Sequence, residues 1–220
     1  MALTKFNYNS FDVTPVASKA MGFNSDADGL TTVADGSMVL IKTLTASSDA
    51  TLSFVDGTSD VVLDNTYPIY VFKFINIHPE TDGAEFKFNL SVDTGSNYNV
   101  TKTTTHIYAF HTEDDEVASL NYDTSRDLAQ GTGFQNLTGD TGNNNDQSLS
   151  GSLQIFNPSS TTFVKHFLAN TNSYYSSDSS YNSYVSGYGN TTSAVDAVRF
   201  QMSADAIDAG VIKLYGIKDS

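Results

Sequence analysis

The chain has 220 residues, of which 39% are hydrophobic, 12% aromatic and only 16% charged. This composition is too apolar for a disordered chain, and the length suits a single all-β domain. With 25 acidic against 11 basic residues, the net charge is −14, and no basic stripe is present to neutralise nucleic-acid phosphates or an anionic membrane surface. We therefore expect neither nucleic acid nor a membrane as a partner.

The absence of cysteine excludes disulfides, thiolate metal sites and cysteine nucleophiles. The first residues, MALTKF, have neither the basic nor the apolar region of a signal peptide. No apolar run approaches the roughly 18 residues that a membrane-spanning helix needs. We therefore expect a soluble protein that is synthesised and folded in a cytoplasm.

In chain order, residues 1–30 carry few core signals and are expected to form an N-terminal arm or edge segment. The remainder, 31–220, is expected to be one β-sandwich domain, because its dominant periodicity is two rather than 3.6. Between Phe86 and Val92, for example, apolar residues alternate with polar ones, as in a strand with one buried face. Similar alternation, or runs of β-branched and aromatic residues, predicts further strands over 37–44, 51–55, 67–77, 101–111, 149–155, 161–168, 198–202 and 211–217.

Turn residues such as Asp56-Gly57 and Asp82-Gly83 separate these strands, and only 116–130 has a composition that fits a turn or two of helix. The run 67–77 is apolar on both faces, which suits a central strand packed between layers or against a neighbouring subunit. The length favours a jelly roll over an immunoglobulin module, whose Cys-Trp-Cys pattern is also missing. We predict an all-β, jelly-roll-like antiparallel β-sandwich in a single domain.

One segment near the N-terminus resembles a calcium-binding loop. Asn24, Asp26 and Asp28 occupy the first, third and fifth positions of an EF-hand pattern, and Asp35 occupies the twelfth. Position one is Asn, position twelve is the shorter Asp, and neither flank is predicted to be helical, so an acidic surface turn is the alternative. The polar loop Asp140–Asp146 is a weaker candidate for calcium. We expect no other cofactor.

Catalytic motifs are not found in the sequence, which has no HExxH, GxSxG or P-loop pattern. His106 and His111 lie five apart in a predicted strand, so their side chains are expected on opposite faces. The acidic run 113–116 supplies carboxylates for a glycosidase pair, but acids are abundant throughout the chain and a solvated loop is the simpler interpretation. We therefore predict that the protein is not an enzyme.

The segment 173–190 combines tyrosine with serine, glycine and asparagine, a composition that antibody paratopes also use. Tyrosine offers rigid amphipathic area, and aromatic faces beside amides suit sugar rings. The alternatives are that the tyrosines are buried between subunits, cover an edge strand, or lie in a plain loop. The candidate residues for a ligand site or a subunit interface are Tyr174, Tyr175, Tyr181, Tyr184 and Tyr188.

A family resemblance is carried by five segments: YPIYVFKFINIHPETDG (67–83), DTGSNYNVTKTTT (93–105), DLAQGTGFQ (127–135), NDQSLSGSLQIFNPSSTTFVKHF (145–167) and TTSAVDAVRFQMSADAIDAGVIKLYGIKD (191–219). These segments resemble a family of structural proteins of marine tailed bacteriophages, including cyanophages. The resemblance covers most of the chain from about Phe11 onward. It implies a virion component, a jelly roll and a homotrimer, and it transfers no site residue.

From the residues and the resemblance together, we expect a non-enzymatic phage virion protein, an oligomeric capsid decoration or fibre-like protein. Its expected partners are further copies of itself and other virion proteins such as the major capsid protein. The alternative is a tail-associated receptor-binding adhesin in which the Tyr174–Tyr188 loop contacts a host-surface glycan. A third class, a glycan-cleaving tail enzyme, has no sequence feature of its own. The expected location is the virion, after assembly in a host cytoplasm.

Overall fold

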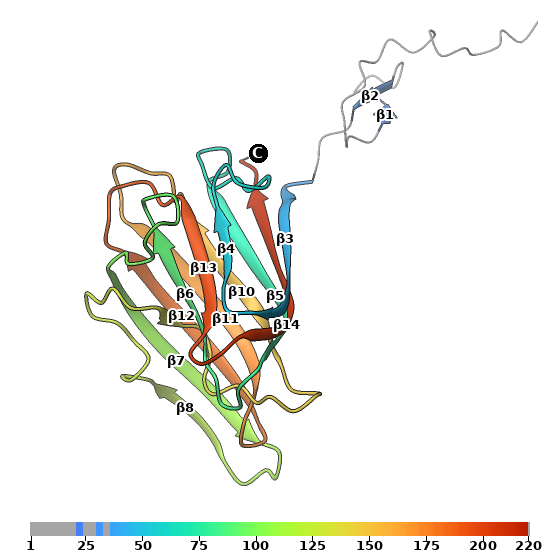
Figure 1. Cartoon of the computed structure of the whole chain (residues 1–220), viewed down its shortest axis with the longest axis vertical. Helices are drawn as coiled ribbons and strands as arrows, with labels where there is room; N and C mark the ends of the chain where they lie inside the picture. Colours follow the sequence, from blue (N-terminus) through green and yellow to red (C-terminus); the bar gives the residue numbers. More distant parts are fainter. Residues whose placement is uncertain (1–20, 24–29, 33–35, 220) are drawn as a thin grey trace, which may run out of the picture.

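The structure is a computed structural model that describes residues 21–23, 30–32 and 36–219. All regular secondary structure in these ranges is β-strand, which confirms the predicted all-β class (Figure 1). The expectation of a helical turn within 116–130 is wrong, because β8 (Ala118–Tyr122) forms there and pairs with the preceding strand. No helix able to cross a membrane is found in the described part of the chain.

The strands form a sandwich of two antiparallel sheets. The large sheet has eight strands in the order β3-β14-β5-β10-β11-β12-β7-β8, and the small sheet has four in the order β4-β13-β6-β9. The remaining strands of the large sheet are β3 (Met38–Asp49), β5 (Ile69–Pro79), β7 (Lys102–Thr112), β10 (Leu149–Phe156), β11 (Lys165–Tyr175), β12 (Ser179–Gly189) and β14 (Ile207–Ile217). Those of the small sheet are β4 (Leu52–Val55), β6 (Phe86–Ser91), β9 (Gln135–Asn136) and β13 (Ala197–Met202).

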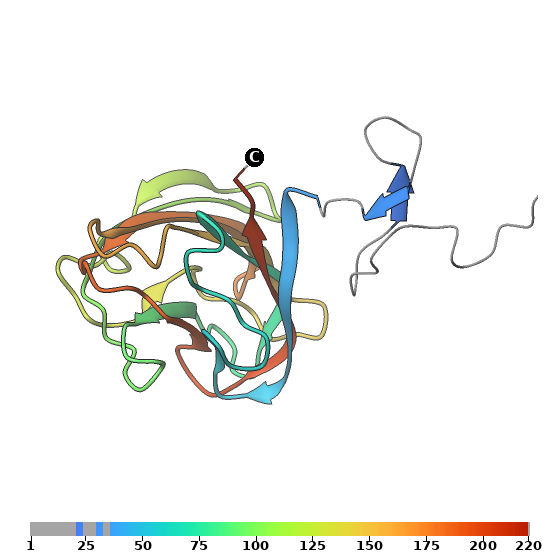
Figure 2. The same ribbon diagram turned by 90° about the horizontal axis from the view of Figure 1, so that it is seen from above.

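The strand order is that of a jelly roll with two insertions in one sheet. Without β7–β8 and β11–β12, the sheets read β3-β14-β5-β10 and β4-β13-β6-β9. Numbered along the chain, these eight strands are arranged 1-8-3-6 and 2-7-4-5, the double Greek key of a jelly roll. Both insertions join the large sheet beyond β10, so that sheet extends well past the small one (Figure 2). This overhang creates the pocket described below.

A separate two-stranded sheet precedes the sandwich. It consists of β1 (Met21–Phe23) and β2 (Leu30–Thr32), which pair with each other in antiparallel fashion. The expected boundary between residues 30 and 31 therefore falls inside β2, while the first sandwich strand begins at Met38. The proposed role of residues 1–30 as an arm or edge segment stays a prediction.

The core lies between the two sheets and is rich in phenylalanine. Phe200 of β13 is in ring contact with Phe72 and Phe74 of the large sheet, at centroid distances of 5.2 and 5.3 Å, and stacks on Phe86 at 5.6 Å. All four side chains are buried. Burying each such side chain contributes roughly 1.5–3 kcal/mol. The alternation predicted around Phe86 thus places its apolar face against the large sheet.

Candidate functional site

The tyrosine-rich segment is a β-hairpin and not a loop. It comprises the end of β11, a turn at Ser176–Asp178 and the whole of β12, which pairs with β7 on its other side. The sequence of β12 is mostly serine, asparagine, glycine and tyrosine and has no regular alternation of apolar and polar residues. The pattern that identifies a half-buried strand is therefore missing, and β12 was not predicted. Successive side chains of a strand point to opposite faces of the sheet, so the tyrosines of this hairpin are divided between two faces.

The five candidate tyrosines consequently do not form one site. Tyr175 and Tyr181 point to the inner face of the large sheet, and Tyr181 is only 5% exposed. Tyr184 lies on the outer face and is 54% exposed. Tyr188 shares that face and contacts the ring of His166, whereas Tyr174 is at the sheet end beside an acidic pocket. Their use in ligand binding or subunit contact stays a prediction.

An aromatic pocket of about 240 Å³ opens on the inner face, where the large sheet extends beyond the small one. Strands β7, β11 and β12 form its floor, and the segment between β8 and β9 supplies an arginine to its wall. The lining residues are Tyr108, Phe110, Thr112, Arg126, Tyr175, Ser177, Ser179 and Tyr181. The volume is slightly below the roughly 300–1,000 Å³ of sites for drug-sized ligands.

Four aromatic rings form a continuous stack along this pocket. Tyr181 lies between Tyr108, at a centroid distance of 4.8 Å and 13° from parallel, and Tyr175, at 5.1 Å and 22°. Tyr108 also stacks on Phe110 at 6.2 Å. Gly139 lies against the stack, and a Cβ there would approach within 2.9 Å of the Tyr181 ring. The rings are therefore held in fixed positions before any ligand arrives.

Arg126 anchors the wall of the pocket through three carboxylates. Its Nε donates to Glu85 at 2.6 Å, and its two terminal nitrogens donate to Asp123 and Asp140, each at 2.7 Å. Burial opposes ionisation of Asp123, but hydrogen bonds from Ser125 and Arg126 outweigh it and lower the pKa of Asp123 to about 2. The negative charge of the three carboxylates exceeds the positive charge of Arg126, and it still does so when Lys87, whose amino group lies 3.0 Å from Glu85, is counted with Arg126. The wall thus carries net negative charge.

Several buried hydroxyls beside the ring stack have no hydrogen-bond partner among the residues that the structure describes. They belong to Tyr181, to Ser173 directly opposite it in β11, and to Ser183, the next inward residue of β12. Burial raises the pKa of the Tyr181 hydroxyl well above its usual value, so this group is a neutral donor. A buried hydroxyl without a partner costs free energy.

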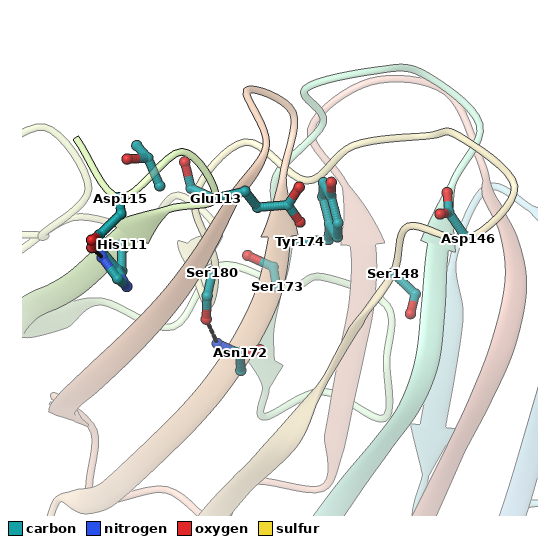
Figure 3. Close-up of a pocket in the computed structure, with 11 residues that line it drawn as sticks. His111, Glu113, Asp115, Asp146, Ser148, Asn172, Ser173, Tyr174 and Ser180 are labelled. Carbon is teal, nitrogen blue, oxygen red and sulfur yellow. Dashed lines mark hydrogen bonds and ion pairs between the residues drawn. The ribbon is translucent and has the colours of Figure 1, made fainter. Parts of the chain in front are cut away.

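A second, acidic pocket of about 510 Å³ lies at the end of the sheet (Figure 3). Glu113 and Tyr174 point toward one another there, and a hydrogen bond to Glu113 raises the pKa of the Tyr174 hydroxyl to about 12. His111 pairs with Asp115 at 2.9 Å. Glu113, Asp115 and Asp146 are all exposed.

The outer face of the large sheet is the broadest uncovered surface formed by the described strands (Figure 2). Paired residues share a face, and on this basis it carries eight exposed large apolar side chains: Met38, Leu40, Ile75, Ile107, Leu120, Tyr122, Leu168 and Tyr184. Among the acidic residues in the described part of the chain, only Asp49 and Asp208 lie in strands. The strands that form the face therefore contribute apolar area and few carboxylates, although the loop residue Asp127 accepts a hydrogen bond from Tyr122.

The predicted calcium ligands Asn24, Asp26, Asp28 and Asp35 lie outside the described residues. Within residues 21–23, 30–32 and 36–219, no group of three metal-ligating side chains is present. In the polar loop Asp140–Asp146, Asp140 is instead engaged by Arg126 and accepts a hydrogen bond from Tyr175 at 2.8 Å.

The sequence analysis missed Tyr108, Phe110 and Arg126 as pocket residues. The first two are ordinary members of a predicted strand, and only the pairing of β7 with β12 brings them beside Tyr181. The chain matches no protein-family model, and comparisons with curated proteins and with solved structures find no significant similarity. Function is therefore inferred chiefly from the surfaces of this chain.

Proposed function

We propose that the protein is a non-enzymatic structural protein of a phage particle and that it acts by assembly, with copies of the chain packing through the outer face of the large sheet. The jelly roll supports this proposal as a scaffold that can display a wide, flat sheet. The resemblance to virion proteins of marine tailed phages suggests the particle, the trimeric state and a further contact with the major capsid protein. The observation that carries the proposal is the composition of the outer face.

Two copies of a protein with a net charge of −14 repel each other unless their contact avoids the carboxylates. The outer face meets this condition, because the acidic residues that the structure describes lie almost entirely in the loops and not in the strands. The cores of stable interfaces are likewise depleted in charge and enriched in aromatic and apolar side chains. A second copy of this chain is therefore the occupant that the face fits best.

Charge on the outer face supports the same conclusion. Lys73 and Lys213 are direct cross-strand partners on β5 and β14, although like charges in this arrangement destabilise a sheet. In an assembly, this pair can face carboxylates from the acidic loops of a neighbouring copy. Contacts of this kind fix the register of an interface more than they add affinity.

The test is the oligomeric state of the purified chain, measured by light scattering coupled to size-exclusion chromatography. We expect an oligomer for the wild type and a folded monomer for the double variant Leu168→Glu/Tyr184→Glu, because it places two carboxylates in the centre of the face. The matched control is Phe163→Glu, which changes a 70% exposed apolar residue outside the outer face and leaves the oligomer intact. A monomeric wild type at the highest soluble concentration would refute self-assembly.

The virion placement is tested separately, by quantitative mass spectrometry of purified particles. A copy number comparable to that of the major capsid protein supports a decoration protein. A much smaller number moves the protein to the tail, and its absence from particles refutes the virion assignment.

A second candidate function, recognition of a host-surface glycan by a tail adhesin, is favoured by the aromatic pocket. A fixed row of rings with hydroxyl groups at its rim offers an apolar surface and hydrogen-bonding groups together. On a particle, several such pockets act at once, so weak individual binding suffices for attachment.

A further inference from the structure

We infer that the aromatic pocket binds a single neutral sugar ring, with the Tyr108–Phe110 side of the stack as the platform and the surrounding hydroxyls as the hydrogen-bonding rim. This inference rests on the second candidate function and specifies its ligand. It is independent of the outer face, because the pocket opens on the opposite side of the large sheet.

We assign the platform to Tyr108 and Phe110, two of the three half-buried rings of the stack; the third, Tyr175, lies at the other end and its hydroxyl donates to Asp140. Tyr181 is enclosed on both sides by Tyr108 and Tyr175, so its faces are already occupied. Phe110 ends the row, and both Tyr108 and Phe110 retain exposed area within the pocket. A pyranose presents an apolar C–H face that matches such a surface, and the negative face of an aromatic ring attracts weakly positive C–H groups.

The rim supplies hydroxyl groups with which a sugar hydroxyl can pair. Thr112, Ser177 and Ser179 line the pocket. The Thr112 hydroxyl is hydrogen-bonded to the backbone of Val117, and the Ser179 hydroxyl donates to the Ser177 carbonyl oxygen. Ser179 thus offers an acceptor, and the Ser177 hydroxyl can act as donor or acceptor. Tyr181 also lines the pocket, but its hydroxyl is buried from solvent and is not part of the rim. A purely apolar ligand cannot use the rim hydroxyls.

The charge of the wall selects among sugars. Arg126 is surrounded by Glu85, Asp123 and Asp140, and each of its three side-chain nitrogens donates a hydrogen bond to one of these carboxylates. Because the cluster is net negative, the guanidinium cannot serve as an anion site, and an acidic sugar meets repulsion there. The pocket volume of about 240 Å³ fits one ring and not an extended oligosaccharide. The structure thus favours a neutral hexose or N-acetylhexosamine at the end of a glycan.

The experiment is saturation-transfer difference NMR on the full chain with methyl glycosides of glucose, galactose, mannose, N-acetylglucosamine and glucuronic acid. We expect ring-proton signals for at least one neutral glycoside, a dissociation constant in the millimolar range because one ring offers few contact atoms, and at least fivefold weaker binding of the glucuronide. A second neutral glycoside added in excess should suppress the specific signals and leave non-specific transfer unchanged.

Three variants test the location. Tyr108→Leu and Phe110→Leu keep apolar volume but remove the ring face, and we expect each to weaken binding at least fivefold while the chain stays folded and oligomeric. Phe163→Leu makes the same type of change at an exposed phenylalanine outside the pocket and leaves binding unchanged. Equal binding by Phe110→Leu and wild type, or no binding of any neutral glycoside, overturns the inference.

Failure of this inference and failure of the adhesin function are distinguishable. Purified protein that adheres to host cells without binding any glycoside keeps the adhesin function and refutes the sugar pocket. Glycoside binding that Phe110→Leu abolishes, combined with unchanged adherence of that variant to host cells, keeps the pocket and refutes its role in attachment.

Discussion

The buried amino group of Lys102 donates a hydrogen bond of 2.5 Å to the side-chain oxygen of Asn89, linking β7 of the large sheet to β6 of the small one. It also donates to the carbonyl oxygen of Val100 at 2.8 Å. No carboxylate forms an ion pair with it among the residues that the structure describes. Burial lowers the pKa of Lys102 to about 7, because desolvation penalises the charged form.

This arrangement predicts that stability rises with pH above neutrality. The folded chain loses the Lys102 proton near pH 7, whereas the unfolded chain holds it until about pH 10. The unfolded state therefore binds more protons between these values, and the free energy of unfolding increases with pH, by roughly 1–2 kcal/mol between pH 7 and pH 9. Burial also lowers the pKa of Lys165, which acts in the same direction. Urea unfolding at a series of pH values measures the slope.

The variant Lys102→Met isolates the contribution of this group. Methionine suits a buried site, and the Asn89 oxygen keeps a donor in the backbone amide of Leu90. We expect the pH slope to fall in this variant and to stay unchanged in Lys213→Met, which removes a lysine from the outer face. A wild-type stability that is flat or falls between pH 7 and pH 9 would contradict the prediction.

For Arg126 we predict a loss of stability on substitution that becomes smaller as the pH falls. In Arg126→Met, three carboxylates remain close together without their cation, so we expect a loss of about 3 kcal/mol at pH 7. The loss should shrink toward pH 4.5, because the pKa of Asp123, held near 2 in the wild type, rises when the guanidinium is gone and protonation relieves the repulsion. Thermal unfolding at both pH values measures the difference.

Arg199→Met is the matched control for this experiment. Arg199 donates to Ser53 at 2.9 Å and lies 3.9 Å from the centre of the Tyr98 ring, with no carboxylate partner among the described residues. Its removal should cost stability by an amount that does not change between pH 7 and pH 4.5. Parallel pH responses of the two variants would show that Arg126 does not act through its carboxylates.

The fold was largely predictable because its core strands carry a strong alternation. Around Phe86 and Phe200 the period of two is unambiguous, and both side chains are buried where the pattern places them. The short β9 and the polar β12 escaped detection. The inner face of β12 carries Ser179, Tyr181 and Ser183, a set that packs under other tyrosines and not in an apolar core. Local composition cannot distinguish such a strand from a loop.

The candidate site was less predictable because it depends on pairing between distant segments. Tyr181 was identified from composition, but its neighbour Tyr108 lies more than 70 positions earlier in the chain. Arg126 reaches the same pocket from the segment 116–130, whose composition was compatible with a turn or two of helix. The pairing of β7 with β12 creates the pocket, and a local sequence pattern cannot predict which strands pair.

The calcium hypothesis is tested by chelation. If Asn24, Asp26, Asp28 and Asp35 bind calcium, EGTA should lower the melting temperature of the calcium-loaded chain, because a ligand that binds only the folded state stabilises it. Asp26→Ala should remove this response. Asp146→Ala, which changes the polar loop instead, should leave it intact. An unchanged melting temperature after chelation would end the hypothesis.

A final prediction compares two neighbouring tyrosines of the aromatic pocket. Tyr175 donates to Asp140 at 2.8 Å, whereas the Tyr181 hydroxyl has no partner in the described ranges of the chain. Tyr175→Phe should therefore cost about 1 kcal/mol, and Tyr181→Phe should be neutral or stabilising, because it deletes a buried group that is not satisfied. Both variants keep the ring stack. Urea unfolding measures the two changes, and a larger loss for Tyr181→Phe would mean that its hydroxyl is satisfied by ordered solvent, which a bound sugar would then have to displace.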